Sequence, residues 1–145
     1  MSTLNADQLI ALVLASFEAE RTHNIDANLK LISKDFRFTD MTLNTDGTPF
    51  VVVGGQQACE LMKVAFPIKN REFIFISICA DENTQKVIVE FIESYPDPAN
   101  NKEFRTPQVA VCEIKDGLIH RTRHYMDPRI SYLHLSEQDI NKAYK

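Results

Sequence analysis

Several strong signals are missing from this chain of 145 residues. Its formal net charge is -4 and no basic stripe runs through it, so neither nucleic acid nor an anionic membrane is expected as a partner. No apolar run approaches the roughly 20 residues of a membrane-spanning helix. Residues 1–7 also lack the basic and apolar regions of a secretory signal peptide, and we therefore expect a cytoplasmic protein.

Cysteines and cofactor motifs are scarce too. Cys59, Cys79 and Cys112 are far apart and form no CxxC pair, so a disulfide framework is not expected. Each lies in an apolar run, which is typical of a small buried hydrophobe; a nucleophilic Cys112 is the alternative. The chain contains no Walker loop, no dinucleotide-binding glycine pattern and no Ser/His/Asp order, and we expect no bound cofactor.

The overall composition is typical of one globular domain over residues 1–145. Hydrophobic residues make up 44% of the chain and charged residues 25%. A chain of this length buries roughly 70% of the surface that it exposes when unfolded. No linker, internal repeat or low-complexity segment divides it.

Helical patterns dominate the first half of the chain. Asn5 has the spacing of a reciprocal N-terminal cap with the glutamine three residues on, and an apolar stripe follows, which predicts a helix over residues 7–21. Asn24 can cap a second, shorter helix whose inward face includes Ile32. Pro67 ends a third amphipathic helix.

Strand patterns dominate the second half. Asn44 and Asp46 mark a loop after an early strand, and further strands are predicted over residues 72–79, 86–95, 105–115 and 118–126. Asp116-Gly117 joins the last two as a type I′ hairpin, which needs positive φ at both positions. Helices first and a four-strand antiparallel meander last predict an α+β fold, with three N-terminal helices packed on a curved, mostly antiparallel sheet.

Four segments carry a resemblance to a known family: residues 45–54 (TDGTPFVVVG), 65–67 (AFP), 112–121 (CEIKDGLIHR) and 123–128 (RHYMDP). With this order of elements, the chain resembles the ketosteroid isomerase/nuclear transport factor 2 superfamily in its SnoaL-like branch, and looks most like the phenazine biosynthesis A/B-type proteins. The resemblance implies a cone-shaped roll with a pocket for a small molecule. Such a fold hosts isomerases, epoxide hydrolases, cyclases, dehydratases and binding modules.

The resemblance also implies roles for two positions. Asp40 stands at the end of the first strand, where ketosteroid isomerases keep their general base, and His124 stands where phenazine-type proteins have an acidic residue. The first helix offers Ser16 or Phe17 near the place of the isomerases' oxyanion-hole tyrosine. Neither is a phenol, so steroid isomerisation is not expected, and histidine in place of the acid argues against phenazine-type chemistry.

The residues themselves also single out Asp40. It shares a strand face with Phe36 and Phe38, where a solvent-facing carboxylate is not expected. Burial among apolar side chains raises the pKa of a carboxyl group and suits it to general-base catalysis near neutral pH. The alternative is that Asp40 only begins a turn and accepts a hydrogen bond from its own backbone.

His124 is the second catalytic candidate. Alternation places His120, Thr122, His124 and Met126 on one face of the last strand. If that face lines the pocket, His124 can shuttle a proton or donate a hydrogen bond to a ligand; a histidine satisfied by a core partner is the alternative. His120 and His124 lie about 13 Å apart on a strand, too far for one ion, and no other cluster has ligand spacing, so we expect no metal.

Glu90 has two interpretations. It either belongs to the exposed side of its strand or lines the pocket as a partner for His124. Further side chains expected to contact the ligand are Phe17, Phe38, Met62, Phe66, Gln108, Thr122 and Met126. The strand over residues 72–79 is apolar on both faces, which, with the resemblance, predicts a homodimer through the outer face of the sheet.

Three hypotheses follow. In the first, a cofactor-free enzyme uses Asp40 to abstract a proton and His124 to return it or to stabilise an oxyanion, during isomerisation, dehydration or cyclisation of an oxygenated, partly apolar metabolite. In the second, the same pocket binds a small molecule without turnover. In the third, the chain is an interaction protein whose pocket is closed by Phe36, Phe38 and Phe66.

Overall fold

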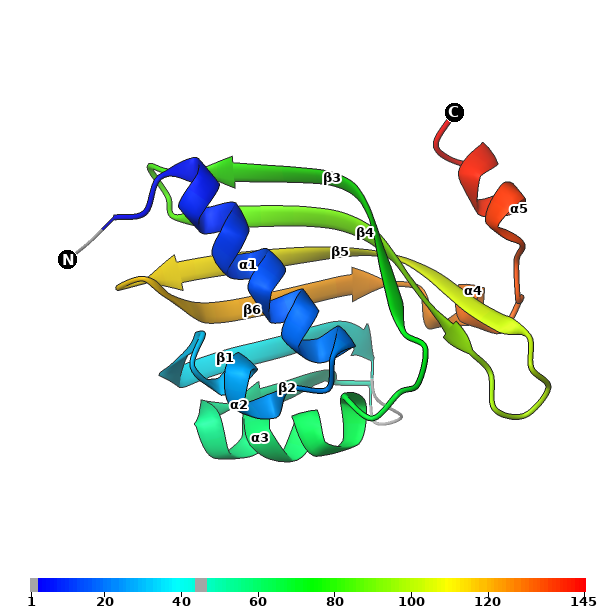
Figure 1. The fold of residues 1–145 in the computed structure, drawn as a ribbon, viewed down its shortest axis with the longest axis horizontal. Coiled ribbons are helices and arrows are strands. Elements are labelled where there is room, and N and C mark those ends of the chain that lie inside the picture. Colours follow the sequence, from blue (N-terminus) through cyan, green and yellow to red (C-terminus); the bar gives the residue numbers. More distant parts are fainter. Residues whose placement is uncertain (1–2, 44–46) are drawn as a thin grey trace.

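A single six-stranded sheet organises the computed structural model, which describes residues 3–43 and 47–145. The strands are β1 (Ile32–Leu43), β2 (Pro49–Val53), β3 (Glu72–Asp81), β4 (Lys86–Pro96), β5 (Glu103–Lys115) and β6 (Leu118–Met126). Their order is β2-β1-β6-β5-β4-β3; β1 pairs with β6 in parallel and the other neighbours are antiparallel (Figure 1). The predicted meander is confirmed, whereas the loop signals at Asn44 and Asp46 lie outside the described residues.

The helices lie mainly against one face of this sheet. They are α1 (Ala6–Arg21), α2 (Ile25–Leu29), α3 (Gly54–Ala65), α4 (Pro128–Ser131) and α5 (Glu137–Lys142). In Figure 1, α1 crosses the sheet diagonally, α3 runs beside β1 and β2, and α4 and α5 follow β6. The predicted α+β class is therefore confirmed. None of the helices in the described ranges has the length and hydropathy that a membrane crossing requires.

Local capping signals fix the start of the first two helices. Asn5 and Gln8 form the reciprocal cap of α1, and the Asn24 side chain accepts a hydrogen bond from the backbone N–H of Ala27 at 3.0 Å. The prediction for Ile32 is wrong, because α2 is only 5 residues long and Ile32 is the first residue of β1. Ile32 is nevertheless buried.

The last hairpin has the predicted turn but an unexpected bulge. Asp116 and Gly117 have φ values of 53° and 76°. The register then shifts by one residue, since Glu113 pairs with Arg121 and Ile114 with Ile119. This β-bulge reverses the alternation of β6 at His120. The prediction that His120 shares a face with His124 is therefore wrong, and Ile119 is buried on the inner side.

Two hydrophobic clusters flank the middle of the molecule. One joins α1 to β4 and β5, and it contains Leu9, Phe17 and Phe91. The other joins α3 to β1 and β6, and it contains Phe36 and Met62. The space between the two clusters is the site described below.

The cysteines differ from one another in exposure. Cys112 is buried in the first cluster, and burial raises the pKa of its thiol to about 11, which disfavours the nucleophilic thiolate at neutral pH. Cys59 is half-buried and Cys79 is exposed. The prediction of a buried Cys79 is wrong because Cys79 pairs with the exposed Ile88 on the outer face of the sheet.

Phe17 gives a test of the first cluster. Its ring packs edge-on against Phe73 and Phe91, with centroids 5.0 and 4.9 Å away. We expect Phe17→Ala to lower the free energy of unfolding, measured in urea, by about 3–5 kcal/mol. The control Val64→Ala, at a position 78% exposed on α3, should change it by less than about 0.5 kcal/mol. A loss below about 1 kcal/mol for Phe17→Ala would contradict this packing.

Candidate active site

A cavity of ≈ 330 Å³ lies between the two hydrophobic clusters. Its wall contains side chains from α1, α2, α3 and all six strands. Most of that wall is aromatic or aliphatic. Phe36, Phe38 and Phe66 line the cavity without filling it, so the expected closure of the pocket by these three rings is wrong.

Asp40 and His124 meet in this wall. They are direct neighbours across the parallel pair of β1 and β6, whose strands run about 4.8 Å apart. Asp40 Oδ1 accepts a hydrogen bond from the backbone N–H of Thr42 at 2.8 Å, as the turn interpretation predicts. Asp40 also lines the cavity, so both interpretations of this residue describe part of its environment.

His124 lies against aromatic rings. Its imidazole is 5.0 Å from the Phe38 ring and 6.0 Å from the Phe91 ring, measured between centroids. Burial lowers the pKa of His124 to about 4, although the negative charge of Asp40 opposes this change. At neutral pH the imidazole is therefore uncharged, and it can donate one hydrogen bond and accept another.

Most of the other expected ligand contacts also lie in the cavity wall. These residues are Phe38, Met62, Phe66, Gln108, Thr122 and Met126. They come from β1, from α3 and the turn after it, from β5 and from β6. Their positions follow from strand alternation and helical spacing.

Two expected contacts lie elsewhere. Glu90 is on the outer side of β4, where its carboxylate accepts a hydrogen bond from Ser77 Oγ at 3.1 Å, because the inner side is taken by Val89 and Phe91. Phe17 is in the core beside Phe91 and does not line the ≈ 330 Å³ cavity. Both predictions are therefore corrected.

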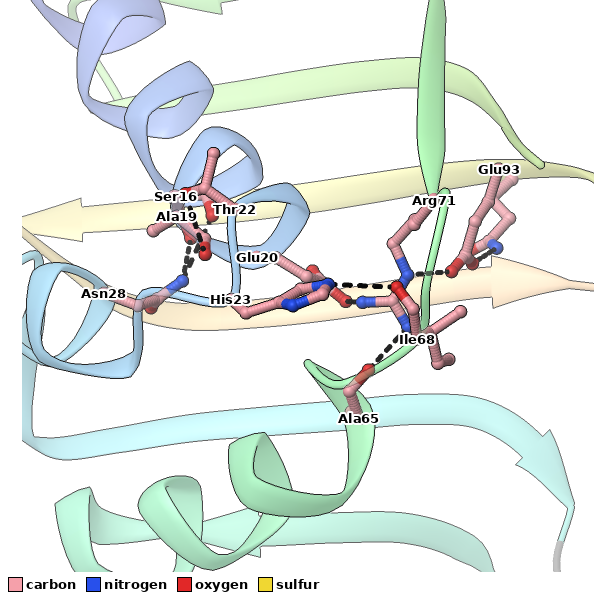
Figure 2. A network of polar contacts seen from close by, with 11 residues as sticks. Ser16, Ala19, Glu20, Thr22, His23, Asn28, Ala65, Ile68, Arg71 and Glu93 are labelled. Atoms are coloured by element: carbon pink, nitrogen blue, oxygen red, sulfur yellow. Dashed lines mark hydrogen bonds and ion pairs between the residues drawn. The ribbon is translucent and has the colours of Figure 1, made fainter. Parts of the chain in front are cut away.

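The sequence analysis missed a buried ion-pair cluster in the cavity wall (Figure 2). Arg71 Nη1 donates to Glu20 Oε1 at 2.6 Å, and Arg71 Nε lies 3.1 Å from Glu93 Oε1 in an ion pair without hydrogen-bond geometry. Arg71 Nη2 donates to the Ala65 carbonyl at 2.6 Å, and Gln108 Nε2 donates to Glu93 Oε2 at 2.6 Å. The Arg71 side chain is only 3% exposed, so water cannot screen its charge.

Glu20 carries the strongest electrostatic signature of this cluster. Burial raises its pKa to about 7; the positive charge of Arg71 opposes the rise and the negative charge of Glu93 adds to it. The sequence indicates the inward position of Glu20, because this residue continues the apolar stripe of α1 three residues beyond Phe17. Glu93 likewise continues the inner face of β4 two residues beyond Phe91.

Ser16 on α1 is hydrogen-bonded to Asn28 on α2. Asn28 is buried, and its side-chain amide donates to both Oγ and the carbonyl of Ser16 at 3.1 Å. Both residues line the cavity. They add a hydroxyl and an amide group to the part of the wall where α1 also contributes Glu20.

Metal ligands do not gather in the part of the chain that the structure describes, where no three His, Cys, Asp or Glu side chains form a suitable group. His120 lies away from the cavity, with Nδ1 3.4 Å from Asp35 Oδ1 and 3.3 Å from Ser33 Oγ. This position results from the bulge in β6.

Comparison with known proteins supports the fold. The sequence matches no protein-family model and no curated protein. A Bacillus subtilis protein proposed to be an isomerase has a TM-score of 0.75 at 16% identity, with 89% of this chain and 95% of that chain covered. A Jannaschia sp. CCS1 protein proposed to be a SnoaL-like polyketide cyclase has a TM-score of 0.74 at 16% identity, with 94% and 97% covered.

A third similar structure is an LEH-like epoxide hydrolase of M. tuberculosis, with a TM-score of 0.72 at 18% identity and 90% of each chain covered. At these identities the likeness establishes the fold alone. That fold is the one shared by nuclear transport factor 2-like, ketosteroid isomerase-like and SnoaL-like proteins, which confirms the predicted superfamily fold. The phenazine-type resemblance stays a prediction.

Glu20 and His124 make stability depend on pH in opposite senses. The folded protein keeps the Glu20 proton up to a pKa of about 7, so this stabilisation is complete below the ordinary 4.5 and is lost as the pH rises to about 7. For His124 the folded pKa of about 4 lies below the ordinary 6.5, so its stabilisation is complete above 6.5 and is lost as the pH falls to about 4.

Single variants should separate these two effects. In Glu20→Gln only the effect of His124 remains. We therefore expect its free energy of unfolding to rise by at most about 3 kcal/mol as the pH rises from 4 to 6.5. In His124→Gln only the effect of Glu20 remains, so the free energy of unfolding should fall by a similar amount as the pH rises from 4.5 to 7. In the wild type the two slopes oppose each other. Urea titrations that give both variants the wild-type pH dependence would contradict these assignments.

Proposed function

We propose that this chain, whose fold is that of the nuclear transport factor 2-like proteins, is a cofactor-free enzyme that performs acid–base chemistry on an oxygenated, partly apolar metabolite. The reaction would be an isomerisation, dehydration or cyclisation. The proposal is supported by one observation above all, the placement of Asp40 beside His124 in the wall of a ≈ 330 Å³ cavity. Proteins with this fold include epoxide hydrolases and proteins proposed to be isomerases and cyclases.

The two residues have complementary roles in this proposal. Asp40 abstracts a proton from a carbon next to a carbonyl group, and His124 donates a hydrogen bond to the oxygen on which negative charge develops. His124 suits the second role because its pKa of about 4 keeps the imidazole neutral at pH 7. As a proton carrier it would be charged in only about one molecule in a thousand at that pH.

The cavity wall indicates the character of the substrate. Phe36, Phe38, Phe66 and Phe91 offer apolar surface, whereas the polar groups include the Arg71 cluster and the Asp40–His124 pair. Pockets of this composition bind the apolar part of a ligand by burying its surface and orient the ligand through polar contacts. A partly apolar molecule with one or two oxygen functions matches this distribution.

A binding module without turnover is the second candidate. It is favoured by the hydrogen bond from the Thr42 backbone to Asp40 Oδ1, which occupies part of the proposed base. In this case Asp40 and His124 only orient the ligand. The two candidates differ in what happens when the carboxylate of Asp40 is removed.

Asp40→Asn distinguishes them. For an enzyme, we expect kcat/KM to fall by about 10²–10⁴ while ligand affinity changes by less than about threefold, since the amide keeps the shape of the side chain. His124→Gln should lower kcat by about 10–10³. The assay would use the small molecule identified by mass spectrometry in the purified protein. Asp35→Asn, at a site 73% exposed on the same strand, is the matched control and should change neither quantity.

An enzyme of this kind is excluded if Asp40→Asn retains both the affinity and the turnover of the wild type. If the ligand binds to the wild type and no product forms, the binding module is the better account.

We also propose a homodimer, formed through the outer face of the sheet. Ile74, Ile88 and Tyr125 are 41%, 47% and 42% exposed there, on β3, β4 and β6 of the meander. Exposed apolar side chains on one face of a sheet are typical of a protein interface.

Ile88→Glu tests the homodimer. We expect the wild type to have twice the chain mass of 16.6 kDa by light scattering, and Ile88→Glu to have the chain mass itself, because a buried unpaired carboxylate opposes association. Val64→Glu, on the exposed side of α3, should leave the dimer intact. A monomeric wild type, or a dimeric Ile88→Glu protein, would contradict the proposal.

A further inference from the structure

A small recess adjoins the cavity and is bounded by Glu20 and His124. Its volume is ≈ 40 Å³, and it shares Ser16, Glu20, Thr122 and His124 with the larger cavity. A space of this size suits water rather than a larger ligand, provided that polar groups surround it. Two hydroxyl groups, a carboxyl group and an imidazole meet that condition.

The Glu20–Arg71–Glu93 cluster borders this recess through Glu20. One buried guanidinium lies between two carboxyl groups, so its single positive charge cannot neutralise both. Glu93 also accepts a hydrogen bond from Gln108, whereas in the described part of the chain Glu20 accepts one only from Arg71. The proton therefore resides on Glu20, in agreement with its pKa of about 7.

The exposed part of Glu20 faces open space inside the protein. Its side chain is 27% exposed, and it lines both the cavity and the recess. The charged or titratable groups that share the cavity or the recess with it are Asp40 on β1, Arg71 before β3, Glu93 and Tyr95 on β4, Cys112 on β5 and His124 on β6. The mechanism proposed for Asp40 and His124 leaves this second acid–base group unused.

We infer that Glu20 is the proton donor of this site, that the recess receives the departing water, and that the substrate is a β-hydroxy carbonyl compound. This inference rests on the proposed function and deepens it. It selects dehydration from the three reactions, since neither isomerisation nor cyclisation needs a separate donor beside a space for one small leaving group. The enzyme would be a hydro-lyase.

The step balances without a cofactor. Asp40 takes the proton from the carbon between the carbonyl and the carbinol carbon, and the electrons of that C–H bond form the carbon–carbon double bond. His124 donates a hydrogen bond to the carbonyl oxygen. The carbon–oxygen bond to the hydroxyl group breaks, and that oxygen takes the proton of Glu20 and leaves as water. Asp40 ends protonated and Glu20 ionised, and exchange with water restores both.

Arg71 and Glu93 are positioning residues in this scheme. Arg71 holds the Glu20 carboxyl group through Oε1; burial raises the pKa of that group, and the negative charge of Glu93 adds to the rise. Replacing Glu93 by Gln removes that charge while keeping the shape of the side chain. The titration of Glu20 should then move to lower pH, which a merely structural role of Glu93 would not cause.

The first measurement is the titration of Glu20 itself. Carbon-13 NMR of the glutamate carboxyl groups, assigned with Glu20→Gln, should give a pKa near 7 for Glu20 and a lower one in Glu93→Gln. Glu18, exposed on the same helix, is the reference signal, and Glu18→Gln is the matched control. A Glu20 that titrates like an exposed glutamate overturns the inference, whatever the substrate.

The second measurement uses 4-hydroxy-4-phenylbutan-2-one, a β-hydroxy ketone whose dehydration yields a conjugated, absorbing product. We expect the wild type to accelerate this reaction and the rate to fall about tenfold per pH unit above pH 7, as Glu20 ionises. Glu20→Gln should lower kcat by about 10²–10⁴ and abolish that decline. Glu93→Gln should start the decline at lower pH and so lower the activity measured at pH 7, and Glu18→Gln should behave as the wild type.

The outcomes separate the inference from the proposed function. If Asp40→Asn loses the activity while Glu20→Gln keeps both the rate and the pH profile, Glu20 is not the donor and the proposed function stands. If Asp40→Asn keeps the activity, the proposed function itself is wrong. If the wild type does not accelerate the reaction, the substrate class inferred here is wrong.

Discussion

The cavity depends on how the protein accommodates one buried guanidinium. Arg71 joins the end of α1 through Glu20, the end of α3 through the Ala65 carbonyl and the sheet through Glu93 (Figure 2). A single charged side chain thereby fixes three elements around the space between the two hydrophobic clusters. Removing one partner of a buried ion pair costs about 3–5 kcal/mol, so Glu93, the ionised partner of Arg71, also stabilises the wall that holds it.

The same cluster contributes to the charge inside the cavity. Burial raises the pKa of Glu20 to about 7, the positive charge of Arg71 opposes this rise and the negative charge of Glu93 adds to it, so the cluster contains a glutamic acid that keeps its proton close to neutral pH. On β6, burial instead keeps His124 neutral. The cavity therefore combines a proton donor and a neutral hydrogen-bonding imidazole with the carboxylate of Asp40. Environments that separate the pKa values of neighbouring groups are typical of sites that perform acid–base chemistry.

Those features of the fold that depend on residues close together in the chain could be predicted from the sequence. The Asn5 cap, the Asp116-Gly117 turn, the alternation in β1 and the meander could all be inferred, because each depends on residues a few positions apart. The bulge at His120 could not, since an extra residue in a strand leaves no clear pattern. Glu20, Arg71 and Glu93 come from three separate segments, and their meeting depends on how α1 packs across the sheet. Extending the stripe of α1 and the inner face of β4 would have pointed to the two glutamates alone.

The most direct test of the account is a crystal structure of the protein as purified, with the cavity inspected for bound small molecules. The account predicts density for a partly apolar molecule, with an oxygen within about 3.2 Å of a His124 ring nitrogen and a carbon facing the Asp40 carboxylate. A cavity closed by Phe36, Phe38 and Phe66, or a molecule whose polar end points away from His124, would contradict it.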